Sequence, residues 1–187
     1  MSNQQTVVLL DGGMGQELIK RSANAPTPLW SATVMRDEPD LVTTVHADYI
    51  QADARVITLN NYSATPVRLA KHGLSTAFSE LHQAAITAAQ RAIAQTKPTH
   101  PVAVAGCLPP LVSSYHAEDV PSEAACLADY RALVAAQKDG VNLFLCETLT
   151  TVREVQTAAT AGKESGHPVW VGMTVDDQDG TRLRSGE

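Results

Sequence analysis

The feature that most constrains the fold is a regular alternation of short apolar runs with segments of helical periodicity. Five runs have the length and continuous apolar character of buried strands, and in the segments between them apolar residues recur every three or four positions. The predicted strands cover residues 6–10, 55–59, 102–105, 143–146 and 169–175. Continuous apolar strands separated by helices are typical of a parallel sheet with covered faces. We therefore predict an α/β fold in which four strand–helix units precede a fifth strand.

Local signals mark the ends of four predicted helices, which cover about residues 37–52, 74–93, 122–140 and 151–162. The first helix opens with an acidic turn that contains Pro39, a residue favoured in the first turn of a helix. The third is expected to stop at Gly140, and the fourth opens with a capping box of Thr151 and Glu154. The proline-containing segment between the first strand and residue 37 is predicted to be irregular.

Composition excludes several classes of function. Of the 187 residues, 44% are hydrophobic and 18% are charged, so residues 1–187 are expected to form one domain with a buried core. The formal net charge is -6 and no basic cluster relieves it, so we expect neither a nucleic acid nor a membrane as a partner. The apolar runs are too short to cross a bilayer, and the N-terminus lacks the features of a signal peptide. These observations predict a cytoplasmic protein.

Polar residues follow the predicted strands at the edge of the sheet where parallel α/β proteins carry their chemistry. Asp11 follows the first strand, Asn60 and Asn61 follow the second, and Glu147 follows the fourth. Two carboxylates and two amides on one rim suit the ammonium and carboxylate groups of an amino acid. Each residue alone is equally well explained as a turn residue, so the interpretation depends on the set. Glu147 is the most informative member, because a charge that ends an apolar run needs a partner or a ligand.

Three cysteines, Cys107, Cys126 and Cys146, are too widely spaced to indicate a disulfide framework or a zinc knuckle. Cys146 directly precedes Glu147, so in a strand the two side chains point to opposite faces. With Glu147 toward the site, Cys146 faces the helices. We predict core positions for the cysteines and no metal ligand in this chain.

A glycine-rich segment, Gly12-Gly13-Met14-Gly15, follows the first predicted strand. A dinucleotide-binding fingerprint requires a third glycine at position 18, where this chain has Leu18, and an acidic residue in a second strand about twenty residues on. The chain has neither, so no cofactor is expected at this turn. It also contains no Ser-His-Asp arrangement or nucleophile elbow, and no catalytic residue is predicted.

Seven segments in order resemble the homocysteine S-methyltransferase family. They are 9–18 (LLDGGMGQEL), 28–32 (PLWSA), 46–50 (HADYI), 57–62 (ITLNNY), 105–111 (AGCLPPL), 146–148 (CET), and 175–177 with 184–187 (VDD and RSGE). The chain departs from the family at three places. It has Asp53-Ala54-Arg55 where the family usually has Gly-Ala-Asp, Leu59-Asn60-Asn61 where Thr-Asn-Thr is usual, and Cys107 where Ser is usual.

The resemblance implies a (β/α)8 TIM barrel and a methyltransferase of methionine biosynthesis that transfers a methyl group to the sulfur of homocysteine. The implied donor is a sulfonium or ammonium compound, which leaves S-methylmethionine, S-adenosylmethionine and betaine open. A zinc ion in the family binds the homocysteine thiol and favours the thiolate, the form that attacks a methyl group. Asp11, Gly12 and Glu147 match homocysteine-binding positions of the family, and Asn60 matches the polar end of the second strand in the pocket.

The resemblance also implies zinc ligands that these 187 residues do not contain. In the family, three cysteines in the second half of the barrel hold the zinc, two of them in a Gly-Gly-Cys-Cys motif. A whole barrel has about 250 residues. We therefore expect the first five strands and four helices of a barrel that is incomplete at its C-terminus, inactive alone and without zinc.

In such an incomplete barrel, the first and fifth strands are edge strands without a neighbour on one side. Edges of this kind attract another chain, so we expect that a homo-oligomer could form through them. The alternative function is a short non-catalytic protein, derived from a barrel, that binds a ligand or a partner. A barrel aldolase lacks support, because no strand ends on a lysine that would form a Schiff base.

Overall fold

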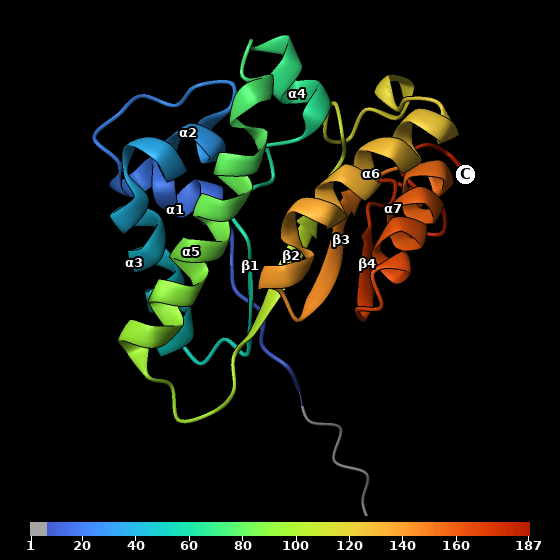
Figure 1. Ribbon diagram of the computed structural model, residues 1–187. Helices are drawn as coiled ribbons and strands as arrows, with labels where there is room; N and C mark the ends of the chain where they lie inside the picture. The colour runs from blue at the N-terminus through green and yellow to red at the C-terminus, as the bar shows by residue number, and fades with distance from the viewer. Residues whose placement is uncertain (1–6) are drawn as a thin grey trace, which may run out of the picture.

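The computed structural model describes residues 7–187 and is built on a parallel sheet with strand order β1-β2-β3-β4 (Figure 1). The strands are β1 (Val56–Thr58), β2 (Ala103–Leu108), β3 (Leu143–Leu149) and β4 (Val169–Met173). Each strand pairs in parallel with the next one in the sequence, so every connection crosses over through helical structure. The α/β fold with a parallel sheet is confirmed.

The first predicted strand, residues 6–10, forms less regular structure than expected. Thr6 lies outside the described residues, and Leu10 makes a single parallel bridge to Val56. The Arg55 N–H donates to the Leu9 carbonyl at 2.8 Å, and the Asp11 N–H donates to the Val56 carbonyl at 3.0 Å. The segment therefore lies beside β1 at the edge of the sheet. Among the described residues, its strand-type pairing is to β1.

All four predicted helices are present. They are α3 (Pro39–Gln51), α5 (Phe78–Thr96), α6 (Glu123–Gln137) and α7 (Val152–Glu164). Pro39 is in the first turn of α3, and the capping box of Thr151 and Glu154 at α7 is complete in both directions. At α6 the Ser122 hydroxyl accepts from the Ala125 N–H, and a short 3-10 turn follows the helix as far as Gly140.

Three further helices were not predicted: α1 (Met14–Arg21), α2 (Trp30–Asp37) and α4 (Pro66–Lys71). The expectation of an irregular segment before residue 37 is therefore wrong for much of that segment. In α1, Met14 and Leu18 lie one turn apart and are buried, while Glu17 on the exposed side pairs with Lys20 and Arg21. A helix of two turns has too few apolar positions to show a clear periodicity.

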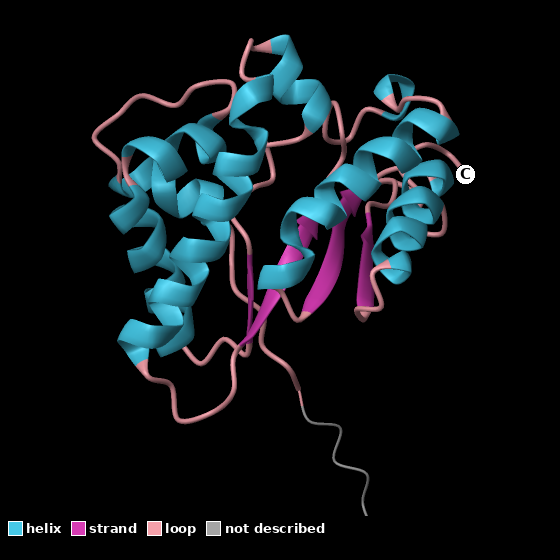
Figure 2. Ribbon diagram, viewed as in Figure 1, coloured by secondary structure: helices cyan, strands magenta, loops and turns pink. Residues whose placement is uncertain are grey.

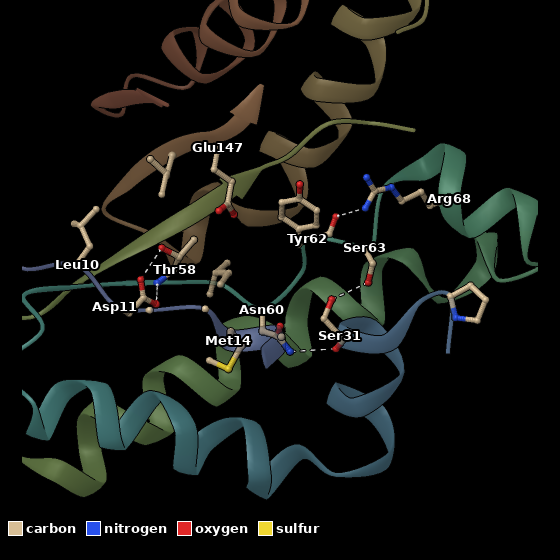
Figure 3. Close-up of a pocket in the computed structure, with 16 residues that line it drawn as sticks. Leu10, Asp11, Met14, Ser31, Thr58, Asn60, Tyr62, Ser63, Arg68 and Glu147 are labelled. Carbon is tan, nitrogen blue, oxygen red and sulfur yellow. Dashed lines mark hydrogen bonds between the residues drawn. The ribbon is translucent and has the colours of Figure 1, made fainter. Parts of the chain in front are cut away.

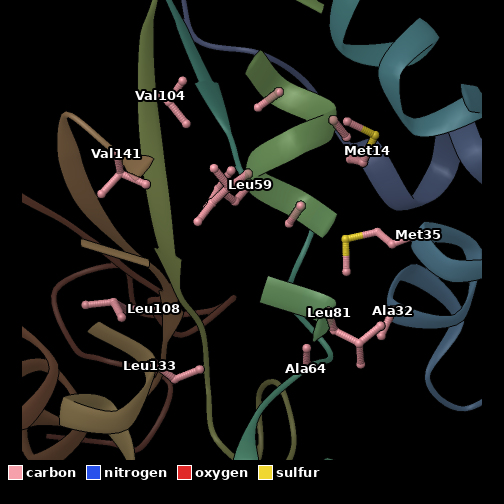
Figure 4. Packing of buried hydrophobic residues seen from close by; sticks show 14 of the residues in the cluster. Met14, Ala32, Met35, Leu59, Ala64, Leu81, Val104, Leu108, Leu133 and Val141 are labelled. Carbon is pink, nitrogen blue, oxygen red and sulfur yellow. The ribbon is translucent and has the colours of Figure 1, made fainter. Parts of the chain in front are cut away.

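The helices enclose a main core on one face of the sheet (Figure 2), where α3 packs on β1, α6 on β2, and α7 on β3 and β4. Along β2, Val104 and Leu108 belong to this core, as Figure 4 shows, whereas Ala105 joins a smaller cluster with Val56 and Leu143. This alternation follows from the period of two in a strand. The sheet thus has an outer, helix-covered face and an inner face on which the smaller cluster lies.

The two edges of the sheet expose apolar side chains. On the segment before β1, Val7 is 88% exposed, and on β4 Met173 is 54% exposed. None of the helices within residues 7–187 has the length and apolar character needed to span a bilayer.

Candidate functional site

A cavity of about 670 Å³ lies at the carboxyl ends of the strands (Figure 3). It is lined by Leu10, Asp11, Gly12, Gly13, Met14, Gly15, Pro28, Ser31, Thr58, Leu59, Asn60, Tyr62, Ser63, Arg68, Leu145 and Glu147. All four predicted site residues are in this set. The lining comes from the first segment and the turn after it, the start of α1, the loop before α2, α2 itself, the end of β1, the loop that follows it, α4 and β3. Segments far apart in the sequence therefore form one surface.

Asp11 joins the first segment to β1. Its Oδ2 accepts from the Thr58 N–H at 2.7 Å, and its Oδ1 accepts from the Thr58 hydroxyl at 3.1 Å. Burial, with a smaller contribution from the negative charge of Glu147, raises the pKa of Asp11 to about 6, although the two hydrogen bonds from Thr58 lower it in part. A cation brought into the cavity would favour the ionised carboxylate.

Glu147 enters the cavity from β3, while its neighbour Cys146 is fully buried in the main core. The predicted opposite orientation of these two side chains is confirmed. Burial raises the pKa of Glu147, and a hydrogen bond from the Cys107 thiol, with 2.8 Å between Sγ and Oε1, lowers it in part. The cavity thus contains two carboxyl groups whose burial disfavours their charge.

The backbone next to Glu147 is irregular. The register between β3 and β4 shifts between Cys146 and Leu149, and Thr148 has a φ of 62°. A β-branched residue in the left-handed region is uncommon and costs about 1–2 kcal/mol. Bulges of this kind redirect side chains beside functional sites, so the strained turn helps to set the direction in which Glu147 leaves the strand.

Gly12 and Asn60 shape the cavity more than they fill it. A Cβ at Gly12 would lie 2.9 Å from the ring of Tyr49, so a side chain at this position would require the Tyr49 ring to move. The Asn60 Nδ2 donates to the Ser31 carbonyl at 3.1 Å, and its side chain is buried. Asn60 therefore anchors α2 to the loop after β1 at the margin of the cavity.

Asn61 does not join the cavity, although the sequence placed it on the same rim. Its Nδ2 lies 2.7 Å from Nδ1 of His82, and both side chains are buried. The Nε2 of His82 also lies 3.1 Å from the Ala64 carbonyl. Asn61 thus belongs to a polar contact inside the core.

Arg68 also lines the cavity, although no pattern in the sequence predicts it. Among the described residues that line the cavity, Arg68 is the one basic side chain. Its guanidinium donates to the carbonyls of Tyr62, Pro110 and Val112. It also lies 5.3 Å from the centroid of the Tyr62 ring. Arg68 ties the loop after β2 to α4. Its position was not predictable, because α4 itself was not recognised.

The described residues do not fit a zinc ion. Within residues 7–187, no group of three or more His, Cys, Asp or Glu side chains is placed to hold a metal. The thiol of Cys126 donates to the Pro121 carbonyl at the start of α6, Cys146 is in the core, and Cys107 faces Glu147. The three thiols therefore point to different surroundings.

A family model described as homocysteine S-methyltransferase matches residues 8–187. This chain belongs to the homocysteine S-methyltransferase family. It is therefore a member of a methyltransferase family, and the match favours this assignment over the alternative of a short non-catalytic binding protein.

Individual relatives agree with the family match. The chain is 33% identical to the homocysteine S-methyltransferase of Escherichia coli over 201 residues, which cover 97% of this chain and 64% of that enzyme. It is 42% identical over 57 residues to the selenocysteine Se-methyltransferase of Brassica oleracea, across 30% of this chain and 16% of the relative. The chain thus spans less than two thirds of the length of these curated relatives.

Solved structures extend the likeness to the fold. The homocysteine methyltransferase MmuM from Escherichia coli, in its metallated form, superposes with a TM-score of 0.86 at 31% identity. The superposition covers 98% of this chain and 68% of that structure. The apo form gives a TM-score of 0.72 at 26% identity, over 98% of this chain and 65% of that structure.

Proposed function

We propose that the cavity binds the amino-acid part of homocysteine, and that the protein transfers a methyl group to the homocysteine sulfur to give methionine. One observation carries the proposal: Asp11 and Glu147, from two separate strand positions, place partly buried carboxyl groups in one cavity. An ammonium group is the complement of such a pair. Family membership and the Escherichia coli relative support homocysteine as the substrate.

The charges of the cavity suit a zwitterionic ligand. Burial disfavours the ionised forms of Asp11 and Glu147, and an ammonium between them would favour both ionised forms. A charge-assisted hydrogen bond of this kind contributes about 1.5–3 kcal/mol, or roughly a ten- to hundredfold change in affinity. Arg68 adds one positive group to the same lining, which suits the carboxylate of the amino acid.

Methyl transfer requires the homocysteine sulfur as a thiolate, because the thiolate is the nucleophile. The donor in this proposal is a sulfonium or ammonium compound, namely S-methylmethionine, S-adenosylmethionine or betaine. The zinc ion that the family resemblance implies has no ligand set among residues 7–187. The residues described here therefore bind and orient the amino-acid part of the substrate in one barrel-type domain, and we assign them no catalytic step.

Calorimetry with L-homocysteine tests the proposal on the chain as it is. Wild type is expected to bind, and Glu147→Gln is expected to weaken binding about ten- to hundredfold. Glu118→Gln is the matched control, because Glu118 is exposed and bonds to His116 away from the cavity. The analogue 4-mercaptobutyrate lacks the ammonium group, so its affinity should not respond to Glu147→Gln. Equal homocysteine affinity of wild type and Glu147→Gln would refute the assignment.

A further inference from the structure

Cys107 and Glu147 meet on the inner face of the sheet although 40 positions separate them in the sequence. In the register of β2 and β3, Cys107 lies opposite Leu145. Glu147 follows two residues further along β3, and the thiol Sγ of Cys107 donates to Glu147 Oε1 at 2.8 Å. Cys107 is fully buried, whereas Glu147 lines the cavity.

The backbone of Cys107 is held by a buried side chain of α6. The Gln137 Oε1 accepts from the Cys107 N–H at 2.9 Å, and its Nε2 donates to the Cys107 carbonyl at 3.2 Å. Gln137 is fully buried, and its Nε2 also donates to the Leu133 carbonyl at 3.0 Å. The Gln137 amide thus provides a hydrogen-bond partner for both the N–H and the carbonyl of Cys107. Cys107 lies beyond Ala105, the last residue of β2 that pairs with β1.

The neighbouring glycine makes this contact possible. A Cβ at Gly106 would lie 2.6 Å from the Phe144 ring and 3.0 Å from Gln137 Oε1. The absent side chain therefore lets Gln137 reach the strand. Side chains alternate along β2, so Cys107, like Ala105, points to the inner face, where Glu147 is.

We propose that Cys107 is a positioning residue for Glu147, whose Oε1 it holds by a thiol hydrogen bond so that the carboxylate faces the cavity. The bond leaves Oε2 for a cationic group of a ligand. The identity of that ligand rests on the proposed function, whereas the positioning itself concerns only residues of this chain.

The chemistry of the pair determines which group donates. Burial and the adjacent carboxylate both raise the pKa of the Cys107 thiol well above its usual value, so the thiol keeps its proton and is the donor. A donor stabilises the ionised carboxylate and opposes the effect of burial on Glu147. Without the thiol, Glu147 should take up a proton at higher pH.

Carbon-13 NMR titration of the Glu147 side-chain carboxyl tests the proposal without any ligand. Glu147→Gln assigns the resonance. Cys107→Ala should raise the titration midpoint by about one pH unit, and Cys107→Ser, which keeps a donor, should stay close to wild type. Cys126→Ala is the matched control, because it removes a buried thiol that donates to the Pro121 carbonyl instead. An unshifted midpoint in Cys107→Ala, or an equal shift in Cys126→Ala, would overturn the proposal.

A second measurement does not depend on the folding of Cys107→Ala. The infrared S–H stretching band of Cys107 should move to higher frequency in Glu147→Met, because the thiol loses its acceptor, and it should stay in place in Glu118→Gln. An unchanged band in Glu147→Met would contradict the hydrogen bond. Calorimetry with homocysteine on the same proteins reports on the ligand separately. If wild type fails to bind homocysteine, the proposed ligand is wrong. The titration and the infrared result would still decide whether Cys107 positions Glu147.

Discussion

His46 offers a direct test of how burial controls the stability of this fold. The imidazole is fully buried in α3, and among residues 7–187 neither ring nitrogen has a hydrogen-bond partner. Burial lowers the pKa of His46 from 6.5 to about 4. The unfolded chain therefore binds a proton at higher pH than the folded protein does.

The sign and size of the effect follow from these two values. Between pH 6.5 and 4 the unfolded state binds more protons, so the free energy of unfolding falls as the pH is lowered through this window. The contribution is fully present above pH 6.5. For pKa values of 6.5 and about 4, the loss from pH 7.5 to pH 4.5 is about 2.5 kcal/mol.

The comparison of wild type with His46→Leu isolates this contribution, because other titrating groups cancel in the difference. Asp11 in particular has a raised pKa and acts in the opposite direction. Urea unfolding followed by circular dichroism at several pH values between 7.5 and 4.5 gives the free energy of unfolding of each protein. The variant should gain about 2.5 kcal/mol relative to wild type over this range.

The control is His116→Leu. His116 is exposed, and its hydrogen bond with Glu118 raises its pKa, so any contribution it makes is present at low pH and lost as the pH rises. Its variant should therefore not gain stability relative to wild type on acidification. A difference between wild type and His46→Leu that stays constant with pH would refute the argument from burial.

Two further predictions concern the chain as a whole. After dialysis, the 187-residue chain should retain no stoichiometric zinc, because its three thiols point to different surroundings; about one zinc per chain by elemental analysis would contradict this. The apolar edges that expose Val7 and Met173 should promote self-association. Light scattering at increasing concentration should show species larger than 19.9 kDa, and a strictly monomeric chain would show that these edges do not associate.

Elements with strong local signals were predictable from the sequence. The long amphipathic pattern of α5 and the capping box of α7 each depend on residues within a few turns of one another. The short helices α1, α2 and α4 carry few apolar positions and lie near glycines and prolines. Their stability comes from packing on other elements, which local periodicity does not report.

In the candidate site, too, some features were predictable from the sequence and others depend on tertiary contacts. The opposite orientation of Cys146 and Glu147 follows from the period of a strand, and the position of Asp11 at a strand end follows from its place in the chain. The direction of Asn61 into the core, by contrast, depends on His82, and the inclusion of Arg68 depends on α4. Both of these outcomes require contacts with another element.

The sequence by itself determined the alternation of the four sheet strands with α3, α5, α6 and α7, the rim on which Asp11, Asn60 and Glu147 gather, and the family to which the chain is similar, because each of these depends on patterns along the chain. Only the tertiary structure decided that Cys107 meets Glu147 and that Asn60 anchors α2. It also decided that the first segment is joined to β1 by a single parallel bridge, between Leu10 and Val56. The physical reason is that sheet register and helix packing bring together groups many positions apart, and the burial that changes their pKa values exists only after this assembly.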